Sequence, residues 1–207
     1  MISCAGAEVR VGGGTESDRR SACEGIRDAA RLLGGLGLAV AGTVEARIVE
    51  RVESSIGAQL LGSYDVARRQ MLLLGLEALR ATWVVRGVAG VPMSPRLHRS
   101  FAAHEMAHAI ANDNFAPKAP RLCASEYIAA VVQLATLPAP ERELLLRHNP
   151  RLTPYRHERE ISAVMYFIDP WAFAVKSFRH FEAVEDRAAL LRRLLAKGCM
   201  TDQMRQG

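Results

Sequence analysis

The order of hydrophobic and polar positions predicts that short strands come first in this chain and helices follow. Glu8 to Val11 reads as a strand that ends at a glycine run, and alternating apolar positions from Val44 to Val52 predict a second, half-buried strand. Between them, apolar residues at helical spacing predict an amphipathic helix from Ser17 to Leu33, which a pair of glycines then ends.

The next segment predicts the rest of a small sheet. Residues 58–74 read as two strands around a turn from Gly62 to Asp65, and the second of them covers Arg68 to Leu74. A helix is expected from Leu76 to Val85. Together with the earlier strands, this predicts an N-terminal α/β lobe over residues 1–93.

Helical patterns fill residues 94–207. Ser94 is a good N-cap before Pro95, and neither glycine nor proline interrupts the chain from Pro95 to the Asn-Asp-Asn run of residues 112–114, where the helix is expected to stop. Four more helices are expected over residues 123–137, 140–148, 169–178 and 182–196. The predicted fold class is therefore α+β, and the two lobes are expected to form one compact domain.

Length and charge narrow the possible functions. The 207 residues suit a single domain, and 49% hydrophobic residues are ample for a core. The formal net charge of +5 is scattered along the chain, without a long basic run, so no nucleic-acid partner is expected. No apolar stretch reaches the roughly 18 residues that a membrane span requires, so no transmembrane segment is expected.

The His-Glu-Met-Ala-His run of residues 104–108 is the strongest indication of chemistry. Histidines four residues apart share one face of a helix, so His104 and His108 can both point a nitrogen at one metal ion. A carboxylate at Glu105 would then lie beside the open coordination position. An alanine-rich core helix with two incidental histidines is the alternative interpretation.

A catalytic zinc site needs a third protein ligand. The metzincin pattern requires Gly and His where this chain has Ala111 and Asn114, so it does not apply. Asp113 follows His108 too closely to reach the same face of the helix. Glu126 lies on the next predicted helix, which returns past the histidines. Alternatively, Glu126 is a first-turn glutamate that the helix dipole favours.

The pattern from Ser94 to Leu137 resembles the gluzincin zinc metallopeptidases, in which H-E-x-x-H is followed by a glutamate ligand on the next helix. The whole chain is also similar to small bacterial H-E-x-x-H proteins without an assigned activity. The resemblance implies a zincin-like fold that binds Zn²⁺ through His104, His108 and Glu126. It also implies that Glu105 activates a metal-bound water to hydrolyse a peptide or protein substrate. A sheet strand in such a fold commonly pairs with the substrate, here Arg68 to Leu74, and the alternative is that this strand is only a member of the sheet.

Gluzincins usually add a His or Tyr that hydrogen-bonds the oxyanion, and the preferred candidate here is His180, because it lies between two phenylalanines. Tyr127, Tyr166 and His157 are the other candidates, and a structural role for His180 is the alternative. Asp113 or another carboxylate is expected to orient a ligand imidazole. The alternative function is a zincin-fold protein that binds a partner without catalysis, with or without metal.

The four cysteines bear on the cellular compartment. None forms a C-x-x-C pair, so a zinc knuckle or a thioredoxin-like site is not expected. Cys4 and Cys23 could form a disulfide, and the alternative is that all four thiols are free. The resemblance favours a periplasmic or secreted protein whose leader precedes Met1, while a cytoplasmic protein with free thiols stays open.

Overall fold

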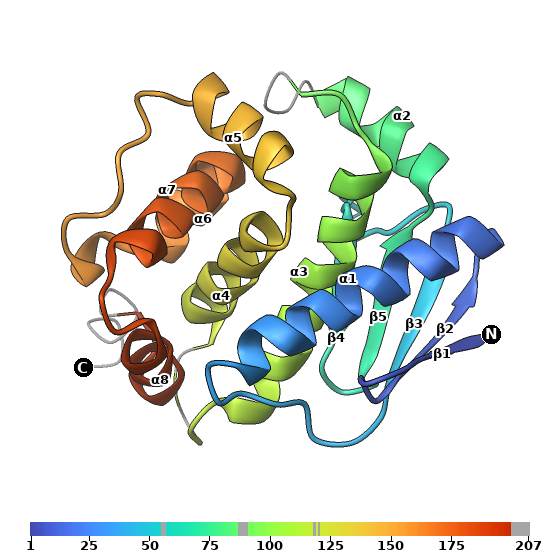
Figure 1. Ribbon diagram of the computed structural model, residues 1–207, viewed down its shortest axis with the longest axis horizontal. Helices are drawn as coiled ribbons and strands as arrows, with labels where there is room; N and C mark the ends of the chain where they lie inside the picture. Colours follow the sequence, from blue (N-terminus) through green and yellow to red (C-terminus); the bar gives the residue numbers. More distant parts are fainter. Residues whose placement is uncertain (55–56, 87–90, 118, 120, 200–207) are drawn as a thin grey trace.

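The N-terminal half forms a sheet with two helices, and the rest is helical (Figure 1). The structure, a computed structural model, describes residues 1–54, 57–86, 91–117, 119 and 121–199. The first elements are β1 (Ile2–Cys4), β2 (Val9–Gly13), α1 (Glu16–Gly34), β3 (Val44–Val49), β4 (Gly62–Asp65), β5 (Gln70–Leu74) and α2 (Leu76–Arg86). After them come α3 (Pro95–Asn114), α4 (Leu122–Ala135), α5 (Ala139–His148), a 3-10 helix (Glu158–Glu160), α6 (Ala163–Ile168), α7 (Pro170–Ala183) and α8 (Arg187–Lys197). The predicted α+β class, with a small N-terminal mixed sheet and a mainly helical remainder, is confirmed.

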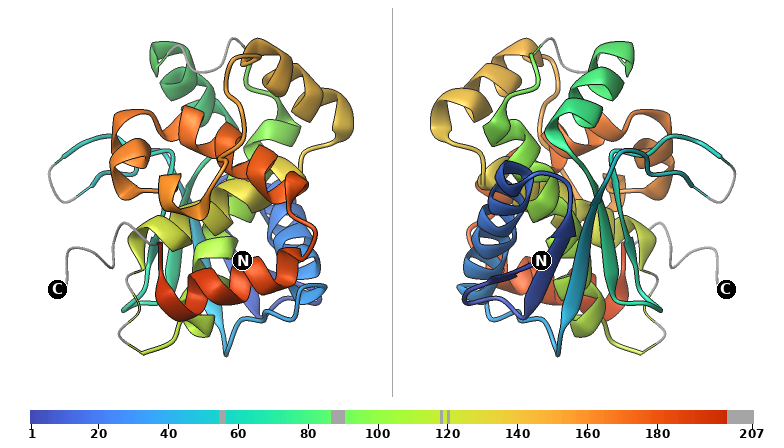
Figure 2. Two further views of the ribbon diagram at one scale, coloured as in Figure 1. Left: turned by 90° about the vertical axis from the view of Figure 1, so that its left-hand side faces the viewer. Right: turned by 90° about the vertical axis from the view of Figure 1, so that its right-hand side faces the viewer.

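The sheet has five strands in the order β1-β2-β3-β5-β4. Strands β2, β3 and β5 are mutually parallel, whereas β1 and β4 run antiparallel to their neighbours. The parallel step from β2 to β3 is made through α1, as a parallel crossover requires. In the right-hand view of Figure 2, the strands form one layer and α1 lies to the left of it. Strand β4, rather than the predicted strand near Arg68 to Leu74, is the outer strand next to the helical half.

Two expected boundaries are wrong. The segment from Gly62 to Asp65 is strand β4 and not a turn. The turn comes later, because the Asp65 carboxylate accepts a hydrogen bond from the Arg68 backbone at 2.9 Å and Arg69 adopts a φ of 50°. The helix expected over residues 182–196 is instead divided, since α7 continues to Ala183 and the Asp186 carboxylate caps α8. Strand β1 and helix α6 were not foreseen.

The buried core lies between the sheet and the helices that carry the functional site. Alternate residues of β3 (Val44, Ala46 and Ile48) are buried beneath α1 and α3. Helices α1 and α3 approach each other closely at Gly25, where a Cβ atom would lie only 2.1 Å from the Arg99 carbonyl oxygen. Glycine at this position therefore lets α1 support α3 along its length.

Two disulfides connect segments near the two ends of the described chain to helices α1 and α4. The predicted Cys4–Cys23 pairing is confirmed, and it joins β1 to α1. A second disulfide, Cys123–Cys199, joins the first turn of α4 to the second residue after the end of α8. No cysteine is free, so the alternative of four free thiols is wrong.

Membrane-spanning potential is limited. Among the helices of the described segments, no single one is long and apolar enough to cross a membrane. Only α4 and α5 taken together, across a bend of 120°, reach the required length and composition.

Candidate metal centre

Helix α3 presents the two histidines from a rigid, buried position. Its start is capped as predicted, because the Ser94 hydroxyl accepts a hydrogen bond from the Leu97 backbone at 3.1 Å and Pro95 occupies the first turn. The helix is packed with fully buried alanines, which allow its neighbours to approach closely. Four-residue spacing then places His104 and His108 on one face, with their Nε2 atoms 3.1 Å apart.

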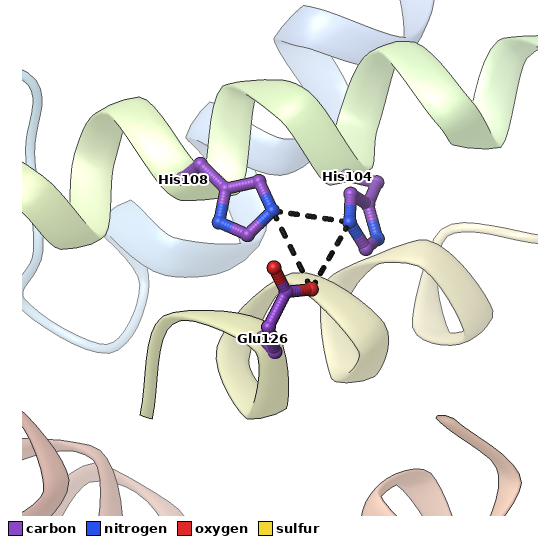
Figure 3. A group of neighbouring side chains, drawn as sticks. All are labelled: His104, His108 and Glu126. Atoms are coloured by element: carbon purple, nitrogen blue, oxygen red, sulfur yellow. Dashed lines mark hydrogen bonds and ion pairs between the residues drawn. The ribbon is translucent and has the colours of Figure 1, made fainter. Parts of the chain in front are cut away.

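Helix α4 brings Glu126 to the same point. Figure 3 shows the Glu126 side chain rising from α4 toward the two imidazoles of α3. Its Oε2 atom lies 3.8 Å from His104 Nε2 and 3.7 Å from His108 Nε2. Glu126 is not in the first turn of α4, which begins at Leu122 and holds no acidic residue there. The dipole interpretation of this glutamate is therefore wrong.

The three donor atoms fit a small divalent cation. A point equidistant from the three atoms lies about 2.1 Å from each of them, which matches ordinary zinc–nitrogen and zinc–oxygen bond lengths. Glu126 Oε2 is buried and has no hydrogen-bond partner among the described residues, an arrangement that is costly unless a cation compensates it. The cluster of His104, His108 and Glu126 could therefore hold a metal ion. Two imidazoles and one carboxylate are a donor set that suits zinc.

Neighbouring polar side chains lie beside each of these donors. His108 Nδ1 lies 2.7 Å from the Ser125 hydroxyl, on the residue before Glu126. Gln133, buried two turns further along α4, interacts with the His104 ring. Burial raises the pKa of Glu126, and the nearby His104 and a hydrogen bond from the Tyr166 hydroxyl of α6 oppose this shift. Such outer contacts fix the orientation of ligands in metal sites.

Asp113, the carboxylate that the sequence suggests as an orienting partner of an imidazole, binds other groups in the structure. Asp113 accepts hydrogen bonds from the Arg69 guanidinium at 2.7 and 2.9 Å and from the Ala41 backbone at 2.7 Å. It therefore anchors the end of α3 to the sheet side of the molecule. The residue that contacts the His108 ring is Ser125 and not the expected carboxylate, and no sequence motif indicates this serine.

Glu105 lies at the edge of the cluster, between α3 and β4. Only 5% of the residue is exposed, and burial together with the nearby Glu126 carboxylate raises its pKa well above the usual range. Burial raises the pKa of Tyr166, and the charges of Glu126 and Glu105 add to this shift, so the three groups lie near one another. A divalent cation bound in this cluster would stabilise the charged forms of Glu105 and Glu126 and would therefore lower the pKa of both carboxyl groups.

Burial keeps the two imidazoles neutral. It lowers the pKa of His104 to about 4, helped by the neighbouring His108, and it lowers the pKa of His108 to about 4. Near neutral pH both rings therefore carry a free lone pair. Histidine binds metal in this neutral form, so neither imidazole has to lose a proton before it can bind a metal ion.

The structure places His180 in a separate polar cluster. Its Nδ1 atom lies 2.7 Å from the Tyr127 hydroxyl, and its ring contacts that of Tyr155. None of the interactions found in the described segments joins His180 to the three clustered donors. Its catalytic role stays a prediction, and Tyr127 is occupied by this contact. His157 is exposed, which leaves Tyr166 as the candidate in contact with the cluster.

Comparison with known proteins identifies a family but not an activity. Residues 9–204 match a family described as a family of unknown function, DUF6639. The chain belongs to the DUF6639 family. No curated protein matches the chain. No solved structure matches it either. For this DUF6639 protein, the arguments about function therefore rest on the geometry of the cluster.

Proposed function

We propose that this DUF6639 protein is a zinc-dependent hydrolase with a zincin-like fold, and specifically a metallopeptidase. In this proposal His104, His108 and Glu126 hold the zinc ion, and Glu105 is the general base. The observation that carries it is the triangle of donor atoms, 3.1, 3.7 and 3.8 Å on its edges, with a buried carboxylate on the residue next to His104.

The chemistry needs a polarised carbonyl and a base. Zinc in this cluster would act as a Lewis acid toward the substrate carbonyl. Glu105 would take a proton from the attacking water and pass it to the amine that leaves when the peptide bond breaks. Burial raises the pKa of Glu105, and this direction supports the double role, because a carboxyl group with a raised pKa returns a proton more readily after accepting it.

Tyr166 is the preferred donor for the developing negative charge. Its hydroxyl lies against Glu126, and burial raises its pKa, so it stays protonated and able to donate. Tyr166 shares this space with Glu105, whereas His180 is held by Tyr127. Removal of one such donor lowers kcat by about 100- to 1,000-fold in enzymes that stabilise an oxyanion.

Strand β4 supports a peptide as the substrate. It is the last strand of the sheet, paired on one side with β5, and it lies beside Glu105. An extended peptide can add to such an edge through backbone hydrogen bonds, which tolerate many sequences. The predicted substrate strand, Arg68 to Leu74, instead contains β5, which is paired on both sides by β3 and β4.

The disulfides support export. Two disulfides that use all four cysteines are typical of proteins that fold in an oxidising compartment such as the periplasm or the exterior of the cell. We therefore expect the substrates to be peptides or proteins of that compartment.

Two measurements test the proposal. Elemental analysis of protein purified without added metal should find about one zinc ion per chain in the wild type and much less in Glu126→Gln. Wild-type protein should cleave members of an unbiased peptide mixture, as read by mass spectrometry. Glu105→Gln should keep the zinc and lose about 100- to 10,000-fold in turnover.

The outcomes separate the alternatives. Unchanged turnover in Glu105→Gln would remove the general-base role. Zinc bound without cleavage of any peptide would favour the non-catalytic binding protein. Absence of zinc and of other divalent ions from the wild type would contradict the metal centre itself.

A further inference from the structure

Gly62, the first residue of β4, lies directly against the carboxyl group of Glu105. A Cβ atom at residue 62 would lie 2.6 Å from Glu105 Oε1 and 3.1 Å from both Cδ and Cγ of the same side chain. All three nearest atoms therefore belong to one residue. The backbone at Gly62 does not have a positive φ, so glycine is not required here for the conformation of the chain.

The close approach has a specific consequence for a larger residue. A carbon and an oxygen cannot remain 2.6 Å apart, so a side chain at residue 62 forces one partner to move. The Glu105 carboxyl group is the end of a flexible side chain, whereas both backbones belong to regular elements, β4 and α3. The carboxyl group is therefore the part that yields, and the fold is retained.

We propose that Gly62 is a positioning residue: its missing side chain leaves the space in which the Glu105 carboxyl group must lie to act. This inference rests on the proposed general-base role of Glu105. A displacement of about 1 Å in a reacting group can lower a rate by about 100-fold, even when the group itself is intact. The edge strand would thus set the position of the base as well as receive the substrate.

Other glycines of the structure do not share this relationship. At Gly25 the nearest atoms to an added Cβ belong to the backbone of α3, so that glycine serves helix packing. At Gly12, in β2 of the same sheet and also without a positive φ, an added Cβ would meet only the Met1 side chain at 3.6 Å. Gly12→Ala is therefore a matched control for Gly62→Ala.

The test compares four proteins: wild type, Gly62→Ala, Gly12→Ala and Glu105→Gln. Gly62→Ala should bind about one zinc ion, should melt close to the wild type, and should lose about 100-fold in kcat with little change in KM. A crystal structure of this variant should show the Glu105 carboxyl group displaced by about 1 Å. Gly12→Ala should match the wild type in zinc content, melting temperature and kcat.

A double variant separates positioning from general damage. In Glu105→Gln/Gly62→Ala, the second substitution should cause little further loss, because the group that it displaces is already inactive. Wild-type kcat in Gly62→Ala, or an undisplaced Glu105 carboxyl group in its crystal structure, would overturn the inference. The crystal structure remains informative if Glu105→Gln shows that Glu105 is not the base, so the two failures are distinguishable.

Discussion

His108 Nδ1 lies 2.7 Å from the hydroxyl oxygen of Ser125, the residue that immediately precedes Glu126. If Nε2 binds a metal ion, Nδ1 carries the proton and donates a hydrogen bond to this oxygen. One turn of α4 thus supplies both a donor atom and the group that fixes the orientation of another. The position of α4 relative to α3 therefore controls the whole cluster.

Ser125→Ala should lower zinc affinity by about 10- to 100-fold, because the His108 ring loses the contact that fixes its tautomer and orientation. Competition with a chelator of known affinity measures the change. Ser125→Thr keeps the hydroxyl and should bind zinc more tightly than Ser125→Ala. Equal affinity in the wild type and Ser125→Ala would show that the contact has no role in metal binding.

The second disulfide should matter for the metal as well as for stability. Cys123 lies in the first turn of α4, two residues before Ser125 and three before Glu126, and its partner Cys199 follows α8. Replacing both cysteines with serine should lower the free energy of unfolding by about 2–5 kcal/mol. It should also weaken zinc binding, since the first turn of α4 loses its anchor.

The first disulfide provides the control. Cys4 and Cys23 join β1 to α1, away from α4. Their replacement should lower stability in urea unfolding but leave the zinc affinity at the wild-type value. An equal loss of zinc affinity in both double variants would show that general destabilisation, rather than the position of α4, is responsible.

Sequence patterns were sufficient for features that depend on local chemistry. The cap at Ser94, the uninterrupted helix after it and the shared face of His104 and His108 follow from residue spacing alone. The return of the next helix with Glu126 could also be anticipated, because the connection is short and small residues line α3.

Features that depend on contacts with another element could not be predicted. The strand from Gly62 to Asp65 looks like a turn in the sequence, and it becomes a strand because β5 pairs with it. Ser125, Gln133 and Gly62 lie next to residues of other elements, so no spacing rule indicates them. His180 is a different case. Its aromatic neighbours in the sequence indicate a buried position, but they do not indicate which residue the ring contacts, and in the structure this residue is Tyr127.

Stability should fall as the pH falls toward 5, in part because of His98. This buried ring fits the neutral form, since its Nε2 lies 2.9 Å from the Leu74 carbonyl oxygen and its Nδ1 lies 3.1 Å from the Ser21 hydroxyl. Burial lowers its pKa, and Arg80 adds to this, while the Leu74 carbonyl and Asp18 oppose it. Below the unfolded pKa of about 6.5, the unfolded chain therefore binds more protons than the folded one.

His98→Gln isolates this contribution, because an amide can both donate and accept a hydrogen bond but does not titrate. Urea unfolding at pH 7 and pH 5 should show a smaller loss of stability in His98→Gln than in the wild type. Each unit by which folding lowers a pKa corresponds to about 1.4 kcal/mol. An identical pH dependence in both proteins would show that other groups cause the acid sensitivity.

The ion pair between Arg69 and Asp113 should stabilise the end of α3. Only 7% of the Asp113 side chain is exposed, and its carboxylate accepts three hydrogen bonds, two from Arg69 and one from the Ala41 backbone. The Arg69 hydrogen bonds hold the pKa of Asp113 below its usual range. Asp113→Asn should therefore lower the free energy of unfolding by about 1–3 kcal/mol near neutral pH, as urea unfolding would measure.

Asp65→Asn is the matched control. Asp65 pairs with Arg68, the residue before Arg69, but this ion pair is more exposed than the one between Arg69 and Asp113. It should lose less stability than Asp113→Asn. Both variants should keep about one zinc ion per chain, since neither carboxylate contacts the candidate ligands. Loss of zinc in Asp113→Asn with little loss of stability would instead restore the expectation that Asp113 orients a ligand imidazole. The two measurements together therefore decide whether this carboxylate serves the fold or the metal.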